Sequence, residues 1–130
     1  MHSTDHIEIE TIIKNWVIAI QKRDIAGILA NHSENIIMYD VPPPFQSVGI
    51  EEYKNTWEQS FFNGTESGVY KVLEMTIEAG IDIAYCFGIL QCSWNNNGVF
   101  EDIKFRLTIG LKKLIGKWII FHEHHSIPSN

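Results

Sequence analysis

The 130-residue sequence has little cysteine, no excess of positive charge and no long apolar run. Its net charge is −6, from 10 basic and 16 acidic residues, which argues against nucleic acid or a membrane surface as the main partner. No apolar stretch approaches the roughly 20 residues of a membrane span. The first ten residues contain no basic region followed by an apolar stretch, so we expect no secretory signal and a cytoplasmic location.

The two cysteines, Cys86 and Cys92, are six positions apart on what is predicted to be one strand. At about 3.3 Å per residue along a strand, their separation of roughly 20 Å exceeds the reach of a disulfide. We therefore expect two buried free thiols. The sequence also lacks repeats, low-complexity tracts and linkers, and its length suits one domain over residues 1–130.

The first half of the chain has apolar residues at helical spacing. A helix is predicted over residues 5–22, where Asp5 and Glu8 resemble a capping box. Asp24 is typical of the cap of a short second helix. A strand is predicted over residues 36–41, then a stiff loop at the three successive prolines 42–44. A third helix is expected over residues 49–62.

The second half of the chain is predicted to be sheet. Strands are expected over residues 69–79, 81–94, 99–112 and 117–126, with a turn at 95–98. In the first of these, alternation places Tyr70 with Glu74 on the polar face. Residues 81–94 are apolar at both parities, which predicts a strand covered on both faces. Helices followed by long strands indicate an α+β fold with segregated layers.

The stretch IIFHEHHSIP, residues 119–128, contains three of the six histidines. Because side chains alternate along a strand, His122 and His124 are expected to share one face with Trp118 and Ile120. Phe121, Glu123 and His125 are expected on the other face. The three histidines therefore cannot converge on one point.

Two interpretations of His122 and His124 remain open. They could supply two metal ligands, with His32, Asp40 or Asp102 as a third, although zinc needs about four ligands with supporting groups. Alternatively, they cover an interface or cap the sheet.

Asp40 ends an otherwise apolar strand, immediately before the prolines. Half-burial would raise the pKa of this carboxyl, which suits a general base. The alternative is an aspartate that only accepts a hydrogen bond from the backbone of the next loop.

Two stretches, WVIAIQKRDIAGILANHSENIIMYD (residues 16–40) and FRLTIGLKKLIGKWIIFHEHHSIP (residues 105–128), resemble the nuclear transport factor 2-like superfamily. The similarity spans nearly the whole chain. It lies closest to the SnoaL-like and ketosteroid isomerase-related group, and the closing hairpin is also similar to the calcium/calmodulin-dependent kinase association domain. The resemblance implies a cone: a curved antiparallel sheet wrapped around the N-terminal helices, as in cystatin-like folds. It also implies an apolar pocket and a homodimer through the convex sheet face.

The resemblance also implies residue roles. Asp40 matches the catalytic base of ketosteroid isomerase, and Trp16 matches its oxyanion-stabilising tyrosine. Its second oxyanion donor falls near Ile103, so both donors are replaced. The indole N–H of Trp16 remains as a possible single donor, which typically supplies a few kcal/mol.

The kinase association domain has a pocket-facing arginine at the position of His125. This register puts Glu123 and His125 inside the cone beside Phe105. The alternative register puts Arg106, His122 and His124 inside. The expected pocket also contains the aromatic residues Trp16, Tyr53, Trp57 and Phe61, whose simpler interpretation is core packing.

The residues and the resemblance leave three function classes open. The first is a cofactor-independent enzyme of the isomerase, cyclase, dehydratase or hydrolase type, with Asp40 or the Glu123–His125 pair as the base. The second is a non-catalytic module that binds a small, apolar or partly polar molecule or forms a dimer. A metal protein built on His122 and His124 is the third alternative. No cofactor is expected.

Overall fold

The computed structural model describes residues 3–62, 68–96 and 98–129. Three helices come early: α1 (Thr4–Lys22), α2 (Ile25–Leu29) and α3 (Ile50–Thr56), which continues into the π-helical turn η1 (Trp57–Phe61). The short strands β1 (His32–Tyr39) and β2 (Ser47–Val48) lie between α2 and α3. Four long strands follow: β3 (Val69–Ala79), β4 (Ile83–Asn96), β5 (Val99–Leu114) and β6 (Lys117–Ser126).

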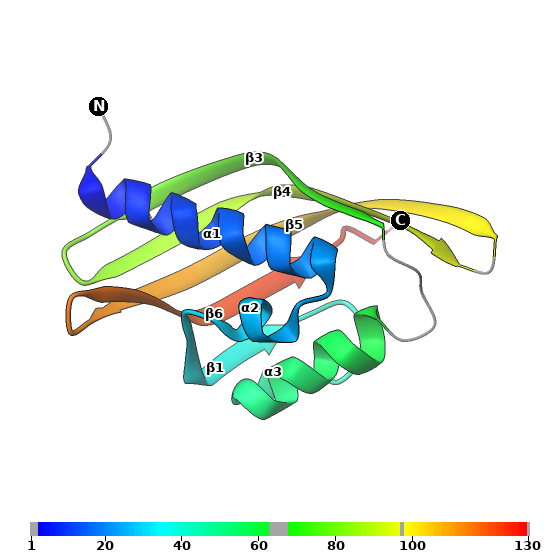
Figure 1. Ribbon diagram of the computed structural model, residues 1–130, viewed down its shortest axis with the longest axis horizontal. Coiled ribbons are helices and arrows are strands. Elements are labelled where there is room, and N and C mark those ends of the chain that lie inside the picture. The colour runs from blue at the N-terminus through cyan, green and yellow to red at the C-terminus, as the bar shows by residue number, and fades with distance from the viewer. Residues whose placement is uncertain (1–2, 63–67, 97, 130) are drawn as a thin grey trace.

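The six strands form one curved sheet in the order β2-β1-β6-β5-β4-β3, and the helices lie on its inner face (Figure 1). The α+β prediction is therefore confirmed. One pairing departs from an antiparallel sheet, because β1 runs parallel to β6. No helix in residues 3–62, 68–96 or 98–129 has the length and apolar character needed to cross a membrane.

The apolar stripe of α1 packs against the inner face of the sheet, as its helical spacing predicts. The core contains residues of α1, β1 and each long strand, among them Ile9, Trp16, Ile20, Ile36, Leu90, Leu107 and Trp118. Cys86 and Cys92 are both buried and free, as predicted.

The predicted start of the first helix needs correction. Its cap is Ser3, whose Oγ accepts a hydrogen bond from the His6 amide at 3.1 Å. Asp5 and Glu8 face the sheet instead: Asp5 Oδ1 accepts from the Trp118 indole at 3.0 Å, and Glu8 Oε2 from the Trp118 amide at 3.2 Å. The two carboxylates that the local pattern assigned to the helix cap thus accept hydrogen bonds from Trp118 of β6 instead.

Other boundaries are closer to prediction. Asp24 caps α2 as expected, accepting a hydrogen bond from the Gly27 amide at 3.2 Å. The strand predicted over residues 36–41 begins earlier, at His32, and ends at Tyr39. The predicted turn at 95–98 includes position 97, which lies outside the described residues.

A bulge in β6 overturns part of the predicted alternation. Gly110 pairs with His122, and Leu111 pairs with Ile120, so Phe121 is left without a partner on β5. An extra residue in a strand switches the face of everything beyond it. Trp118 is therefore in the core with an exposed fraction of 0%, rather than on the outer face, and Phe121 lies under the ammonium of Lys112. Glu123 and His125 keep their predicted inward position.

A second irregularity lies in β3, between Val72 and Glu74. Tyr70 is therefore buried, with an exposed fraction of 2%, and not on the polar face that the alternation predicts. Gly88 of β4 fits beside this irregularity, since a Cβ there would come within 2.1 Å of the Glu74 carbonyl oxygen.

The outer face of β4 is apolar but uncovered within the chain. Ile83, Tyr85 and Phe87 are 51%, 51% and 45% exposed, and the rings of Tyr85 and Phe87 stack at 6.0 Å. The expectation of a strand covered on both faces is therefore wrong for the single chain.

Candidate functional site

A cavity of about 430 Å³ opens where the carboxyl ends of α1, β1 and β6 meet η1 and the ends of β3, β4 and β5. Its walls are mainly apolar and aromatic: Ile20, Val41, Pro42, Trp57, Phe61, Tyr70, Trp94, Ile103, Phe105 and Ile127. Acidic and basic side chains at the wall are Asp40, Arg23, Glu101 and His125. A mainly apolar cavity of this size with a few polar groups is typical of small-molecule sites.

Asp40 reaches the cavity because β1 ends at Tyr39 and the proline-rich loop turns away. Its Oδ1 accepts a hydrogen bond from the Val41 amide at 2.7 Å, so the loop contact of the alternative interpretation is present. Burial raises the pKa of the Asp40 carboxyl above its ordinary value, although the charge of His125 and the Val41 bond oppose the shift. Asp40 thus combines a strengthened basicity with access to the cavity.

His125 lies at the inner end of the same cavity, 6% exposed and stacked on Phe105 at 5.6 Å between ring centroids. Its Nε2 is 3.2 Å from Glu123 Oε1. Burial lowers the pKa of His125, but the Glu123 hydrogen bond and the charges of Asp40 and Glu123 outweigh it, and the net shift is upward. This arrangement favours an imidazolium beside the Asp40 carboxylate.

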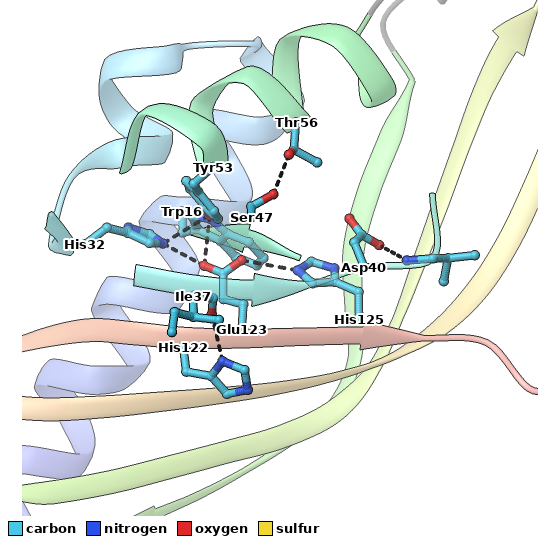
Figure 2. Close-up of polar contacts among 11 residues, drawn as sticks. Trp16, His32, Ile37, Asp40, Ser47, Tyr53, Thr56, His122, Glu123 and His125 are labelled. Atoms are coloured by element: carbon cyan, nitrogen blue, oxygen red, sulfur yellow. Dashed lines mark hydrogen bonds and ion pairs between the residues drawn. The ribbon is translucent and has the colours of Figure 1, made fainter. Parts of the chain in front are cut away.

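Glu123 is the centre of a buried polar network (Figure 2). Its Oε2 lies 2.7 Å from His32 Nε2 and accepts a hydrogen bond from the Tyr53 hydroxyl at 2.8 Å. The Trp16 indole donates to the Tyr53 hydroxyl at 3.0 Å. Burial raises the pKa of Glu123, but the bonds and charges of His125 and His32 prevail and lower it to about 2.

His32 closes this network on the side away from His125. Its Nδ1 lies 2.8 Å from the Ala30 carbonyl oxygen, which can only accept, so Nδ1 carries a hydrogen. Nε2 lies against Glu123, and both side chains are fully buried. Glu123 is therefore held between His32 and His125 by direct contacts within the protein.

A SnoaL-like domain family model matches residues 9–130. The chain belongs to the SnoaL-like domain family. No curated protein matches this SnoaL-like chain in sequence.

Solved structures give the same fold. A nuclear transport factor 2-like protein of unknown function from Pseudomonas putida KT2440 is 27% identical, with a TM-score of 0.89, over 100% of this chain and 91% of that one. A ketosteroid isomerase-like protein from Erwinia carotovora atroseptica SCRI1043 is 19% identical, with a TM-score of 0.82, over 99% of this chain and 100% of that one. Hexachlorocyclohexane dehydrochlorinase LinA-type3 from Novosphingobium barchaimii LL02 is 12% identical, with a TM-score of 0.86, over 96% and 87%.

The cavity of the SnoaL-like protein receives only some of the residues expected there. Asp40, Trp57, Phe61, Phe105 and His125 line it. Three others lie behind this wall in the buried network: Trp16, Tyr53 and Glu123. The Trp16 indole N–H donates its hydrogen bond to the Tyr53 hydroxyl, so this donor is not available to a ligand.

His32 and Tyr70 are parts of the site that sequence reasoning did not assign. His32 appeared only as a possible metal ligand, and its contact with Glu123 spans 91 positions in the chain. Tyr70 was assigned to the polar face, because nothing in the alternation of residues 69–79 reveals the bulge.

The alternative register, with Arg106, His122 and His124 inside, does not occur. Arg106 and His124 are exposed on the outer face, and the rings of His122 and His124 lie 4.9 and 5.3 Å from that of Tyr39. His122 Nδ1 is 2.7 Å from the Ile37 carbonyl oxygen.

The metal alternative is not supported by this arrangement. His32 bonds Glu123 on the inner side, and Asp102 accepts a hydrogen bond from Gln91 at 2.9 Å. In the part of the chain that the structure describes, no three His, Cys, Asp or Glu side chains are grouped so that they could hold a metal ion.

Proposed function

We propose that this SnoaL-like protein binds a small, largely apolar molecule in the cavity and catalyses proton transfer on it without a cofactor. The observation that carries the proposal is the presence of Asp40 and His125 at one aromatic cavity wall. The fold alone does not decide activity. It does support enzymes, since a structural neighbour is a dehydrochlorinase.

The two groups suit complementary roles. The pKa of the Asp40 carboxyl is raised, but it starts from an ordinary value of 3.8, well below neutral pH. Asp40 in its ionised form therefore acts as the base. His125 has a pKa raised above 6.5, so it acts as the acid. Its Nε2 is engaged by Glu123, which leaves Nδ1 as the nitrogen that delivers a proton to the substrate.

This acid–base pair fits isomerisation, dehydration or cyclisation. Asp40 takes a proton from a carbon, and His125 donates one to another carbon or to a departing hydroxyl. Because one proton is removed and one is supplied, the pair requires no redox partner. Apolar walls strengthen both electrostatic effects by excluding water.

Deuterium incorporation from D2O into small ketones and β-hydroxyketones, followed by NMR, tests the proposal. We expect wild-type protein to accelerate exchange or elimination, and Asp40→Asn and His125→Gln to lose about 100-fold or more, the usual scale of general acid–base catalysis. Asp102→Asn and His124→Gln are matched controls outside the cavity. The rate should fall as Asp40 becomes protonated at low pH, and again as His125 loses its proton above pH 6.5.

Binding of these compounds to wild-type protein with no exchange above that of Asp40→Asn and His125→Gln would overturn catalysis and leave the ligand-binding alternative. Absence of binding across the panel, together with unchanged Asp40→Asn and His125→Gln proteins, would contradict both functions.

We further propose a homodimer through the outer face of the sheet. A row across it runs from Phe87 through Thr108 and His124 to Tyr39, strand by strand. Exposed aromatic residues concentrated on one face are typical of protein interfaces. Burial by a second copy would also cover the second apolar face of β4.

A further inference from the structure

Two hairpin turns, one between β3 and β4 and one between β5 and β6, lie side by side at the end of the sheet where α1 begins (Figure 1). The Lys113 amide donates to the Asp82 carbonyl oxygen at 2.8 Å, and the Lys113 ammonium lies 2.8 Å from Asp5 Oδ1 of α1. The first contact extends the pairing of β4 with β5 beyond the end of β4. Continuing its register by one step puts Ile81 beside Leu114, so the apolar residues of the two turns are neighbours.

These apolar neighbours form the turn patch, which consists of Ile81, Leu114 and Ile115. Their exposed fractions are 91%, 53% and 102%, so their side chains have few contacts within the described chain. Single exposed apolar residues are ordinary in folded proteins, whereas adjoining ones are typical of surfaces that another molecule covers. None of the three lines the cavity, so the turn patch is a separate surface.

The backbone at Ile115 is a second, independent observation. Ile115 and Gly116 form the two-residue turn between β5 and β6, with φ angles of 49° and 75°. A turn with positive φ at both positions favours asparagine, aspartate or glycine, because a β-branched side chain crowds the backbone in this conformation. Ile115 therefore adopts an unfavourable backbone conformation while its side chain stays in water. A residue that breaks two local rules without a compensating contact in its own chain indicates a function outside that chain.

The charges beside the turn patch favour one kind of partner. Glu78 and Asp82 are exposed on the hairpin of β3 and β4, and Lys112 and Lys117 are exposed on the hairpin of β5 and β6. An acidic hairpin thus lies next to a basic one. When a two-fold axis passes between the two turns, the acidic hairpin of each copy meets the basic hairpin of the other. An anionic membrane would attract the lysines but repel the carboxylates, so this surface matches a copy of itself better.

We propose that the turn patch binds a second copy of this chain, turn against turn, with Ile81 of each copy packed on Ile115 of the other. This contact goes beyond the proposed function, since it lies away from the cavity and from the aromatic row on the outer face of the sheet. Two turns per copy bury little area, so the contact is weak and transient. It is open in dilute solution and forms when the chain is concentrated.

Sedimentation equilibrium of the 130-residue Phe87→Glu protein tests the proposal, because this substitution removes the other proposed contact between copies. We expect its average mass to rise between about 10 µM and about 1 mM, the range of weak association. In the same background, Ile115→Asn should weaken this association by about tenfold or more, as the loss of a central contact residue does. Phe45→Asn replaces a side chain that is 98% exposed elsewhere and should leave the association unchanged.

A Phe87→Glu protein whose mass stays constant over this concentration range would overturn the proposal. Equal association of the Ile115→Asn and Phe45→Asn variants would overturn it as well. Neither result bears on the cavity, so the proposed function would stand in both cases.

Thermal unfolding separates a role in association from a role in the fold. Asparagine suits the conformation that Ile115 adopts, so Ile115→Asn should unfold in dilute solution at the wild-type temperature or above it. A marked loss of thermal stability would contradict the proposal, because it would mean that the side chain stabilises its own chain. Ile115→Val keeps an apolar, β-branched side chain and should retain the association.

An exchange of charges tests the arrangement itself. In a turn-against-turn pair, Lys117→Glu or Asp82→Lys alone places like charges opposite each other at two positions, so each variant should associate less than the Phe87→Glu parent. Mixing the two variants restores opposite charges at both positions, and mixed pairs should form as the parent pairs do. No association in the mixture would overturn the arrangement. Binding to phosphatidylserine vesicles that is lost in Lys117→Glu and strengthened in Asp82→Lys, without mixed pairs, would reject the second copy in favour of a membrane surface.

Discussion

The two faces of β6 carry similar residues and have different properties. On the inner face, Glu123 and His125 are 0% and 6% exposed, and every contact of the carboxylate is with a protein donor. On the outer face, His122 and His124 surround Tyr39 without a carboxylate partner in the described residues. Residue type alone therefore does not make a site. Burial and contact with a carboxylate distinguish His125 from the two histidines of the outer face.

Removing the Glu123 carboxylate should produce the largest difference in stability between a change on the inner face of β6 and a change on its outer face. Glu123→Ala leaves His32 and His125 buried without their anion, and breaking a buried pair typically costs about 3–5 kcal/mol in the free energy of unfolding. Urea unfolding measures this loss. His124→Gln, one residue along the strand, should change stability by no more than about 0.5 kcal/mol. Similar losses from both variants would show that the faces do not differ.

Lowering the pH should have the second-largest effect, because it removes the contribution of ionised Glu123 to the free energy of unfolding. The pKa of Glu123 is about 2 in the folded protein and 4.5 in the unfolded chain, so ionised Glu123 favours folding above pH 4.5. This contribution, about 3 kcal/mol from a shift of roughly 2.5 pH units, should be lost as the pH falls from 4.5 toward 2. Unfolding of wild type and Glu123→Gln at pH 7 and pH 3 measures it as the difference between the two proteins. Parallel curves would contradict the assignment.

The pKa shift of His125 acts in the opposite direction. Its pKa is raised in the folded protein, so its stabilising contribution is present below pH 6.5 and is lost as the pH rises through the folded value. Both contributions are present between the pH range in which Glu123 becomes protonated and the range in which His125 loses its proton. The free energy of unfolding should therefore be highest between these two ranges.

A charge on the outer face should have the smallest effect on unfolding of the chain itself. Phe87→Glu places a carboxylate on an exposed part of β4, where surface substitutions typically change stability by about 0.5 kcal/mol or less. If a second copy covers this face, light scattering should report a dimer for wild type and a monomer for the variant. Monomeric wild type at micromolar concentration would reject the dimer.

Much of the fold was predictable because it depends on local patterns. The apolar stripe of α1, the Asp24 cap and the long alternating strands all follow from neighbouring residues. Family resemblance supplied the curved sheet and placed Asp40 and His125 toward one cavity. Two of the errors come from local irregularities in β3 and β6.

Those irregularities explain why Trp118 and Tyr70 were assigned to the wrong faces. Alternation has a period of two, so a single extra residue reverses every later assignment, and the residue types around Phe121 and Leu73 do not reveal the bulge. The capping pattern at Asp5 failed for a different reason. The indole N–H of Trp118, a residue 113 positions away, donates to the Asp5 carboxylate, and the sequence around Asp5 does not reveal this donor.

By itself, the sequence determined the helices, the long strands, the two free thiols and the family. The tertiary structure alone decided that His32 and Tyr53 meet Glu123, and that Tyr70 is buried at the cavity wall. Local patterns reflect the energetics of neighbours in the chain. Contacts across 70 or 91 positions depend on strand register and curvature, which form only when the whole sheet closes around its helices.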